Sequence, residues 1–263
     1  MQRNLIFFDV DGTIITADNF IPSSAVEAVR RAQAAGNLCV VNTGRPFAHL
    51  VPSVCDMGFS GYVCSCGQHI ILHDQVLLHE TFSPEQAAEI ISMIRQCRLE
   101  AILESEQGVW FLRAGEPSRQ LRENALHFRE MGFETEGPVD VPGFSFDKFC
   151  VWPGPDSDRN RFLSYIAPLA EIIFRENNLI ELVQKGFSKE TGIRFLMERL
   201  GIPEENCYVL GDSTNDLPMF RCVRNSIAMG GAPEEVKAMA AYVTAPLLEA
   251  GLAKALDHFG LTG

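Results

Sequence analysis

The sequence predicts an α/β fold in which helices cover both faces of a parallel sheet, with an α+β domain inserted into the chain. Three observations indicate this fold. Short apolar runs alternate with helical segments near both ends of the chain, these runs are apolar almost throughout, and the middle of the chain follows a different order of elements. Near-continuous apolar strands are typical of parallel sheets that are covered by helices on each side.

The N-terminal part contains three predicted strands and two predicted helices. The segment "LIFFD" (5–9) predicts the first strand, and "SSAVEAVRRAQAAG" (23–36) predicts a helix that begins after Pro22 and ends at Gly36. The following strand, helix and strand are predicted at 37–41, 46–58 and 61–65.

The same alternation returns towards the C-terminus. The segment "SKETGIRFLMERLG" (188–201) predicts a helix with Ser188 as its N-cap and Gly201 as its terminator. Beyond it, strands are predicted at 206–212, 225–231 and 241–244, and helices at 213–223, 233–240 and 247–260.

The middle of the chain predicts a compact α+β insert. Its predicted elements are a helix at 83–97, a hairpin at 100–105 and 108–115, a helix at 117–132, the segment "FSFDKFCVWP", a helix near 157–167, and strands at 170–176 and 179–184. The sheet core is therefore expected at 1–81 and 185–263, and the insert at 82–184.

The composition narrows the function classes. A chain of 263 residues with 46% hydrophobic and 21% charged residues is ordinary for a soluble globular protein. The net charge of -12 argues against a nucleic-acid-binding surface or a basic membrane anchor. The sequence also has no apolar run of about 18 residues and no pattern of a signal peptide. We therefore expect a cytoplasmic protein with neither a nucleic-acid nor a membrane partner.

The eight cysteines mostly lie inside apolar runs, which is typical of small buried residues in a reducing compartment. One group leaves an alternative open, because Cys64, Cys66, His69 and His73 in "VCSCGQHIILH" are ligands that zinc accepts. The C-x-C spacing differs from the usual C-x2-C, and the strand-like "IIL" favours a hairpin with core cysteines instead.

Four polar stretches follow predicted core elements or begin a helix. They are "DVDGT" (9–13), "NTGRP" (42–46), Lys189 and "GDSTND" (211–216). Ligands of open α/β sheets bind beyond the carboxyl ends of the strands, so we expect these stretches to converge in one crevice. Asp9 and Asp11 would share a face if the strand continued, and we expect the turn at Gly12 to separate them.

The residue types in this crevice indicate phosphoryl chemistry. Several carboxylates without a histidine favour Mg²⁺ over zinc. A metal beside a lysine and a hydroxyl suits a phosphoryl group, whose phosphorus one aspartate attacks. The second aspartate then has a separate task, which is to move the proton.

"DVDGT", "NTGRP", "SKETGIRFL" and "GDSTND" resemble the four motifs of the haloacid dehalogenase superfamily of phosphatases. Their order, with a large insert between the second and third, resembles the Cof-like sugar-phosphatase branch, which has a Rossmann-like core and an α/β cap. "IAMGGAPEEVKAMAAYVT" and "GLAKAL" are similar to the C-terminal signature of that branch. The resemblance implies a Mg²⁺-dependent phosphatase of small phosphorylated metabolites, sugar phosphates above all, that works through an aspartyl-phosphate.

The resemblance also implies a role for each residue of the crevice. Asp9 is expected to be the nucleophile and Asp11 the general acid and base. The expected phosphate-binding residues are Thr43, Gly44, Lys189 and Asn215. The expected metal ligands are Asp9, Asp212 and the backbone carbonyl of Asp11, with Asp216 supporting the metal shell.

Some alternatives stay open at this point. Lys185 competes with Lys189 for the phosphate, and Arg45 of "NTGRP" could simply form part of a turn. A phosphotransferase or phosphomutase would need the same acid and base aspartate, and a non-catalytic metabolite-binding regulator is a third function. The chain departs from the pattern of the branch at Cys66-Gly67, Gly231 and Ala245-Pro246, where substrate or phosphate would be contacted, so the substrate stays open.

Overall fold

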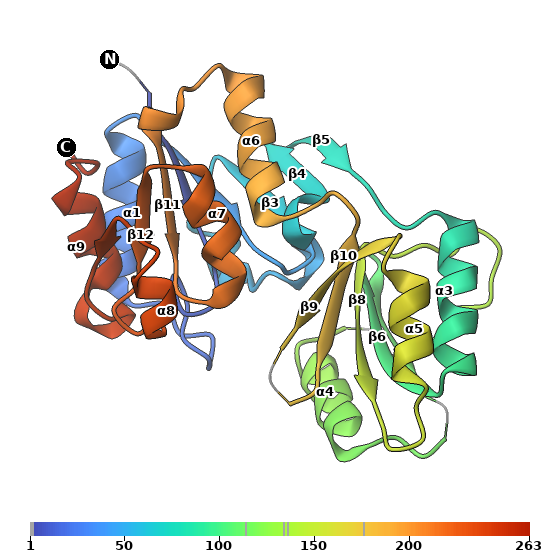
Figure 1. The fold of residues 1–263 in the computed structure, drawn as a ribbon. Helices are drawn as coiled ribbons and strands as arrows, with labels where there is room; N and C mark the ends of the chain where they lie inside the picture. The colour runs from blue at the N-terminus through green and yellow to red at the C-terminus, as the bar shows by residue number, and fades with distance from the viewer. Residues whose placement is uncertain (1–2, 114, 134, 136, 176) are drawn as a thin grey trace. The chain divides into compact units, whose positions relative to one another are not determined.

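The computed structural model describes residues 3–113, 115–133, 135, 137–175 and 177–263, and it separates the chain into two compact units (Figure 1). Unit 1 comprises Met1–His79 and Ser188–Gly263, and unit 2 comprises Glu80–Phe187. The expected insert, 82–184, differs from unit 2 by a few residues at each end. In the part of the chain that the structure describes, no helix is both long enough and apolar enough to cross a bilayer.

Unit 1 is built on an eight-stranded sheet with the strand order β13-β12-β11-β1-β2-β3-β4-β5. Neighbouring strands are parallel from β13 to β3, and the hairpin of β4 and β5 is antiparallel. The strands are β1 (Leu5–Phe8), β2 (Leu38–Asn42), β3 (Gly61–Cys64), β4 (His69–Leu72), β5 (Gln75–His79), β11 (Cys207–Gly211), β12 (Asn225–Ala228) and β13 (Tyr242–Val243).

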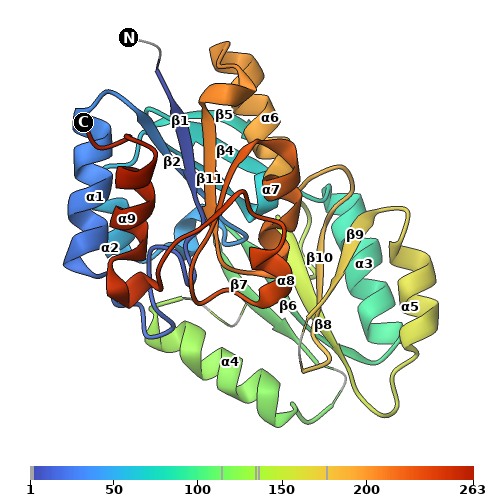
Figure 2. The ribbon, with the colours of Figure 1, turned by 60° about the vertical axis from the view of Figure 1, so that its left-hand side comes forward.

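Helices cover both faces of this sheet because the strands are apolar on both faces. Along β1, Ile6 and Phe8 face the layer of α1 and α9, whereas Leu5 and Phe7 face the layer of α6 and α7 (Figure 2). The helices of unit 1 are α1 (Ser23–Ala34), α2 (Pro52–Cys55), α6 (Lys189–Leu200), α7 (Leu217–Cys222), α8 (Glu234–Lys237) and α9 (Gly251–His258). The predicted parallel-sheet core is confirmed.

Two of the predicted helices contain breaks in the structure. The segment 46–58 forms a 3₁₀ turn at Phe47–His49 and the short helix α2, because Pro52 places Val51 in an extended conformation (φ -67°, ψ 138°) and cannot donate a backbone hydrogen bond. The final predicted helix, 247–260, is interrupted by Ala250, which adopts a left-handed conformation with φ 59°. The apolar pattern continues across both breaks, so periodicity alone conceals them.

Unit 2 contains a five-stranded antiparallel sheet with the order β7-β6-β8-β10-β9. Helices α3 and α5 pack on one face of it, and α4 packs against Ile102 and Val109 on the other face. The elements are α3 (Pro84–Gln96), β6 (Leu99–Ser105), β7 (Gly108–Leu112), α4 (Arg119–Glu130), β8 (Lys148–Pro153), α5 (Arg159–Ile166), β9 (Ala170–Phe174) and β10 (Ile180–Gln184).

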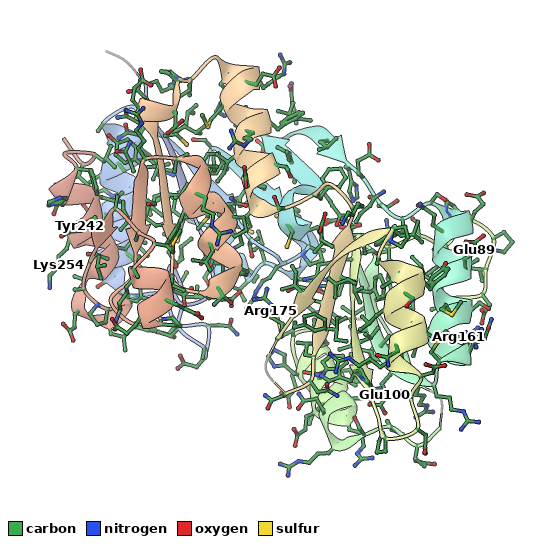
Figure 3. The ribbon with its side chains drawn as sticks, in the orientation of Figure 1. Glu89, Glu100, Arg161, Arg175, Tyr242 and Lys254 are labelled. Carbon is green, nitrogen blue, oxygen red and sulfur yellow. The ribbon has the colours of Figure 1, made fainter. Side chains whose placement is uncertain are left out.

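A buried ion-pair network crosses the sheet of unit 2. Lys148 of β8 donates to Glu181 of β10 at 2.5 Å, and Arg175, which follows β9 and is labelled in Figure 3, donates to the same carboxylate at 2.6 Å. Burial alone would raise the pKa of Glu181, but the charges and hydrogen bonds of Lys148 and Arg175 outweigh burial and lower this pKa from 4.5 to about 2.

We expect acid to weaken unit 2 through Glu181. Because its pKa is lower in the folded state, the stability that Glu181 contributes is complete above about pH 4.5 and is lost as the pH falls towards 2, by roughly 3 kcal/mol in all. Both tryptophans, Trp110 and Trp152, lie in unit 2, so denaturant titrations followed by tryptophan fluorescence report on this unit.

The Glu181→Gln variant is expected to unfold at lower denaturant at neutral pH and to show a flatter dependence on pH below about pH 4.5. Glu171→Gln is the matched control, because Glu171 pairs with Lys185 at a solvent-exposed site of the same sheet. An equal loss of acid dependence in both variants would show that the buried network is not its source.

Candidate active site

The candidate site begins where three adjacent strands of unit 1 end. Strand β1 lies between β11 and β2, and its last residue, Phe8, is in register with Leu210 and Val41. The backbone N–H of Asp9 still donates to Leu210 O at 2.9 Å. The stretches "DVDGT", "NTGRP" and "GDSTND" therefore leave the sheet at the same edge, as predicted from the strand ends.

Lys189 connects two of the predicted acidic residues. Its Nζ lies 2.5 Å from Asp9 Oδ1 and 2.6 Å from Asp216 Oδ1, and all three side chains are almost completely buried. Ser188 caps α6 by accepting from Thr191 N, so Lys189 is the first residue of the helix. Within the described residues, this geometry favours Lys189 over Lys185, whose side chain is half exposed and pairs with Glu171 in unit 2.

Both carboxylate oxygens of Asp216 accept hydrogen bonds from other residues of the site. Its Oδ1 accepts from Lys189, and its Oδ2 accepts from the backbone N–H groups of Asp212 and Ser213 at 2.9 and 3.0 Å. A carboxylate with both oxygens engaged in this way orients its neighbours. Asp216 therefore fixes the position of the lysine and of the backbone that carries Asp212.

The carboxylate of Asp212 lies close to the turn of "DVDGT" at Gly12. A Cβ on Gly12 would lie 2.1 Å from Asp212 Oδ2, and Gly12 has φ +78°, which also favours glycine. Asp212 Oδ1 is buried and has no hydrogen-bond partner in the described part of the chain. A buried carboxylate oxygen without a donor is costly, so this atom is suited to accept a ligand.

The charges of the site do not balance. Asp9, Asp212 and Asp216 offer carboxylate oxygens that all lie within 4.8 Å of one another, and Lys189 supplies one positive charge to them. Burial and Asp216 raise the pKa of Asp9 well above its usual value although Lys189 opposes them, and burial and Asp216 raise the pKa of Asp212 to about 6.

A divalent cation would match this imbalance. Three carboxylates and one ammonium leave two negative charges, and an oxygen-only donor set suits Mg²⁺. Because both oxygens of Asp216 already accept hydrogen bonds, Asp9 and Asp212 are the side chains that fit direct metal ligation. The residues present therefore fit the expected metal.

The remaining predicted residues line the neighbouring loops. Thr43 is buried, its N–H donates to Val63 O at 2.8 Å, and its Oγ1 accepts from Arg45 N at 3.1 Å. Gly44 follows it at a partly buried position. Asn215 accepts a hydrogen bond from Ser213 and is partly buried in the turn before α7.

Asp11 lies apart from the buried acidic group. Its side chain is 56% exposed and forms a bidentate ion pair with Arg45, whereas Asp9 is 3% exposed. The turn at Gly12 thus separates the two carboxylates, as we expected. From the sequence Arg45 could simply form part of a turn, and its place two residues after Thr43 in "NTGRP" was the available signal of a contact at the site.

Asn42 was expected in the crevice as part of "NTGRP", but the sequence did not indicate what its side chain contacts. It is fully buried, and its Nδ2 donates to the backbone oxygen of Lys189 at 3.1 Å. This bond ties the end of β2 to the start of α6, between residues 147 positions apart. Its position at the strand end was the only signal in the sequence.

The zinc alternative finds no support at the cysteine-histidine segment. Among the described residues, the one group of histidine, cysteine or acidic side chains with metal-binding spacing is that of Asp9, Asp212 and Asp216. Cys64 and His69 instead face each other across the β3–β4 pair, and the ring of His69 stacks on His79 at 4.1 Å. The predicted hairpin is confirmed.

Comparison with known proteins gives one family. Residues 6–256 match the sequence profile described as haloacid dehalogenase-like hydrolase. Phosphatase YwpJ of Bacillus subtilis is 27% identical over 97% of this chain and 99% of its own length. The 5-amino-6-(5-phospho-D-ribitylamino)uracil phosphatase YcsE of the same organism is 25% identical over 98% of this chain and 96% of its own length.

A solved structure shows the same likeness over the full fold. The sugar phosphatase BT4131, of HAD subclass IIB, superimposes with a TM-score of 0.80. The two sequences are 27% identical, and the match covers 98% of this chain and 99% of that chain. The similarity therefore extends over both units and is not confined to the motifs.

Proposed function

The chain belongs to the haloacid dehalogenase-like hydrolase family and is a phosphatase, and we propose that it hydrolyses sugar phosphates or closely related metabolites through an aspartyl-phosphate on Asp9, with Mg²⁺. The observation that carries this proposal is the buried Asp9 carboxylate, which Lys189 holds beside Asp212 at the end of β1. The names of BT4131 and YcsE, a sugar phosphatase and a phosphatase of a ribityl phosphate, support the substrate class.

Asp9 and Asp11 divide the reaction between them. A carboxylate oxygen of Asp9 attacks phosphorus in line, and the bond between phosphorus and the ester oxygen breaks. Asp11, in its acid form, gives its proton to the leaving oxygen. Asp11 then takes a proton from water, the water oxygen attacks phosphorus, and the bond to Asp9 breaks with release of inorganic phosphate.

The other residues hold and neutralise the phosphoryl group. Lys189 keeps Asp9 oriented, and its positive charge, with Thr43, Gly44 and Asn215, binds the phosphate oxygens. Asp9, Asp212 and the backbone carbonyl of Asp11 would hold Mg²⁺, which would supply positive charge to the phosphoryl oxygens when bound. Asp216 supports this arrangement through Lys189 and the backbone of Asp212.

We assign unit 2 the role of a cap that excludes water and selects the leaving group.

The departures from the pattern of the branch at Cys66-Gly67, Gly231 and Ala245-Pro246 all lie in unit 1. Cytoplasmic location and the lack of a nucleic-acid partner stay predictions from the sequence.

Removal of divalent metal tests the proposal. We expect release of inorganic phosphate from p-nitrophenyl phosphate and from a panel of sugar phosphates to fall about 100-fold or more in EDTA and to return when Mg²⁺ is added in excess. Product analysis with a second sugar present distinguishes hydrolysis from transfer.

Three outcomes would contradict it. Turnover that is unchanged by chelation would remove the metal from the mechanism, and a phosphoryl group recovered on the second sugar would make the protein a phosphotransferase. Specific binding of a sugar phosphate without turnover of any ester would indicate a regulator.

A further inference from the structure

The guanidinium of Arg45 donates two parallel hydrogen bonds to the carboxylate of Asp11. Its Nε lies 3.0 Å from Oδ2 and its Nη2 lies 2.6 Å from Oδ1. We propose that Arg45 is the positioning residue of Asp11: it orients the ionised carboxylate that receives the proton of water, and its contact with one carboxyl oxygen remains when the other oxygen carries the proton for the leaving group. The inference rests on the proposed function, because it requires Asp11 to be the general acid and base.

The arginine is the fixed partner of this pair. Its Nη1 donates to His49 O at 3.2 Å, its backbone N–H donates to Thr43 Oγ1 at 3.1 Å, and its carbonyl accepts from Ser65 N at 2.9 Å. The Arg45 side chain is 24% exposed, whereas that of Asp11 is 56% exposed. Anchors at both ends of Arg45 make it a rigid reference for a more exposed carboxylate.

Arg45 orients the Asp11 side chain, because the hydrogen bonds within the loop of Asp11 hold the backbone of that loop. The backbone around Asp11 is held by hydrogen bonds such as Gly12 N to Ile15 O at 2.8 Å and Ile14 N to Val10 O at 2.9 Å, but these bonds leave the side chain free to rotate. A bidentate contact with a planar guanidinium fixes both the direction and the plane of a carboxylate.

Orientation of the acid matters most when the leaving group is poor. A sugar alkoxide needs a proton as the bond to phosphorus breaks, whereas p-nitrophenolate leaves without one. A misplaced acid therefore slows the first kind of substrate and spares the second. The ratio kcat/KM reports steps up to the departure of the leaving group, so it isolates this half of the reaction.

The test compares kcat/KM for glucose 6-phosphate and p-nitrophenyl phosphate in Arg45→Gln, Arg45→Lys, Asp11→Asn and the Arg45→Gln/Asp11→Asn double variant. We expect Arg45→Gln to lose about 10- to 100-fold on the sugar phosphate and less than about threefold on the aryl phosphate. Arg45→Lys keeps the charge without the bidentate geometry, and its kcat/KM on the sugar phosphate is expected to lie between those of Arg45→Gln and the wild type.

The double variant is expected to be no slower than Asp11→Asn alone, because Arg45 acts only through Asp11. Arg30→Gln is the matched control, since Arg30 makes a bidentate pair with Glu27 on the exposed face of α1. It is expected to leave kcat/KM unchanged for both substrates.

Equal losses on both substrates in Arg45→Gln, or a further loss in the double variant, would overturn the positioning role. If Asp11→Asn itself spares the sugar phosphate while Asp9→Asn is inactive, the acid and base role assigned to Asp11 fails, and the inference falls with it. A loss specific to the sugar phosphate that disappears in the Asp11→Asn background supports the inference.

Discussion

Asp9→Asn is expected to lower turnover by about 10⁴-fold or more on every phosphate ester, because it removes the atom that attacks phosphorus. An amide oxygen is a far weaker nucleophile than a carboxylate, and the bond from Lys189 to the end of β1 can still form. The measurement is phosphate release under saturating Mg²⁺. In the wild type, acid quenching during turnover should trap a phosphoryl group on the protein, and in the variant this species should be absent.

The same substitution should not unfold unit 1. Burial and Asp216 raise the pKa of Asp9, so a neutral side chain of the same shape removes a charge that the buried site tolerates poorly. Asp74→Asn is the control, because Asp74 lies in the exposed turn between β4 and β5, and we expect wild-type turnover. A residual rate of Asp9→Asn within about 100-fold of the wild type would remove Asp9 from the role of nucleophile.

The position of Asp9 at the sheet edge was predictable from the sequence, whereas the hydrogen bonds that hold its side chain were not. The run "LIFFD" marks a buried strand, and a polar residue at the end of such a strand lies at the carboxyl edge of the sheet whatever the details of packing. The motifs placed Asp212 and Lys189 at the same edge. That Lys189 bonds to both Asp9 and Asp216 depends on where α6 docks on the sheet, over a separation of 180 residues from Asp9, and local pattern carries no such information.

Arg45 and Ala250 show two further limits of local pattern. A turn containing Arg45 is readable from "NTGRP", but its contact with Asp11 requires the loops after β1 and β2 to be brought side by side. Ala250 lies within an apolar helical pattern, yet it takes a left-handed conformation, in which alanine is rare. The next residue, Gly251, lies so close to the preceding loop that a Cβ there would be 1.9 Å from Ala245 O.

Lys189→Met is expected to impair both activity and stability. Removing the ammonium leaves the carboxylates of Asp9 and Asp216 buried without their common cation, and breaking a buried pair in this way costs about 3–5 kcal/mol. Burial alone would lower the pKa of Lys189, but Asp216 and Asp9 outweigh it and raise this pKa, so the lysine is charged at any working pH. Turnover should fall by at least about 100-fold, because the phosphoryl oxygens lose a positive charge.

Hydrogen exchange followed by mass spectrometry separates the two effects, since both tryptophans lie in unit 2 and fluorescence does not report on unit 1. We expect faster exchange in β1 and α6 of Lys189→Met and unchanged exchange in unit 2. Lys185→Met is the matched control, because its exposed pair with Glu171 is worth at most about 1 kcal/mol. Equal losses of turnover and of exchange protection in both variants would mean that burial does not distinguish the two lysines. Lost turnover with protected β1 amides would mean that Lys189 acts on the phosphate alone. In that case Asp9 and Asp216 would not need the lysine in order to stay buried.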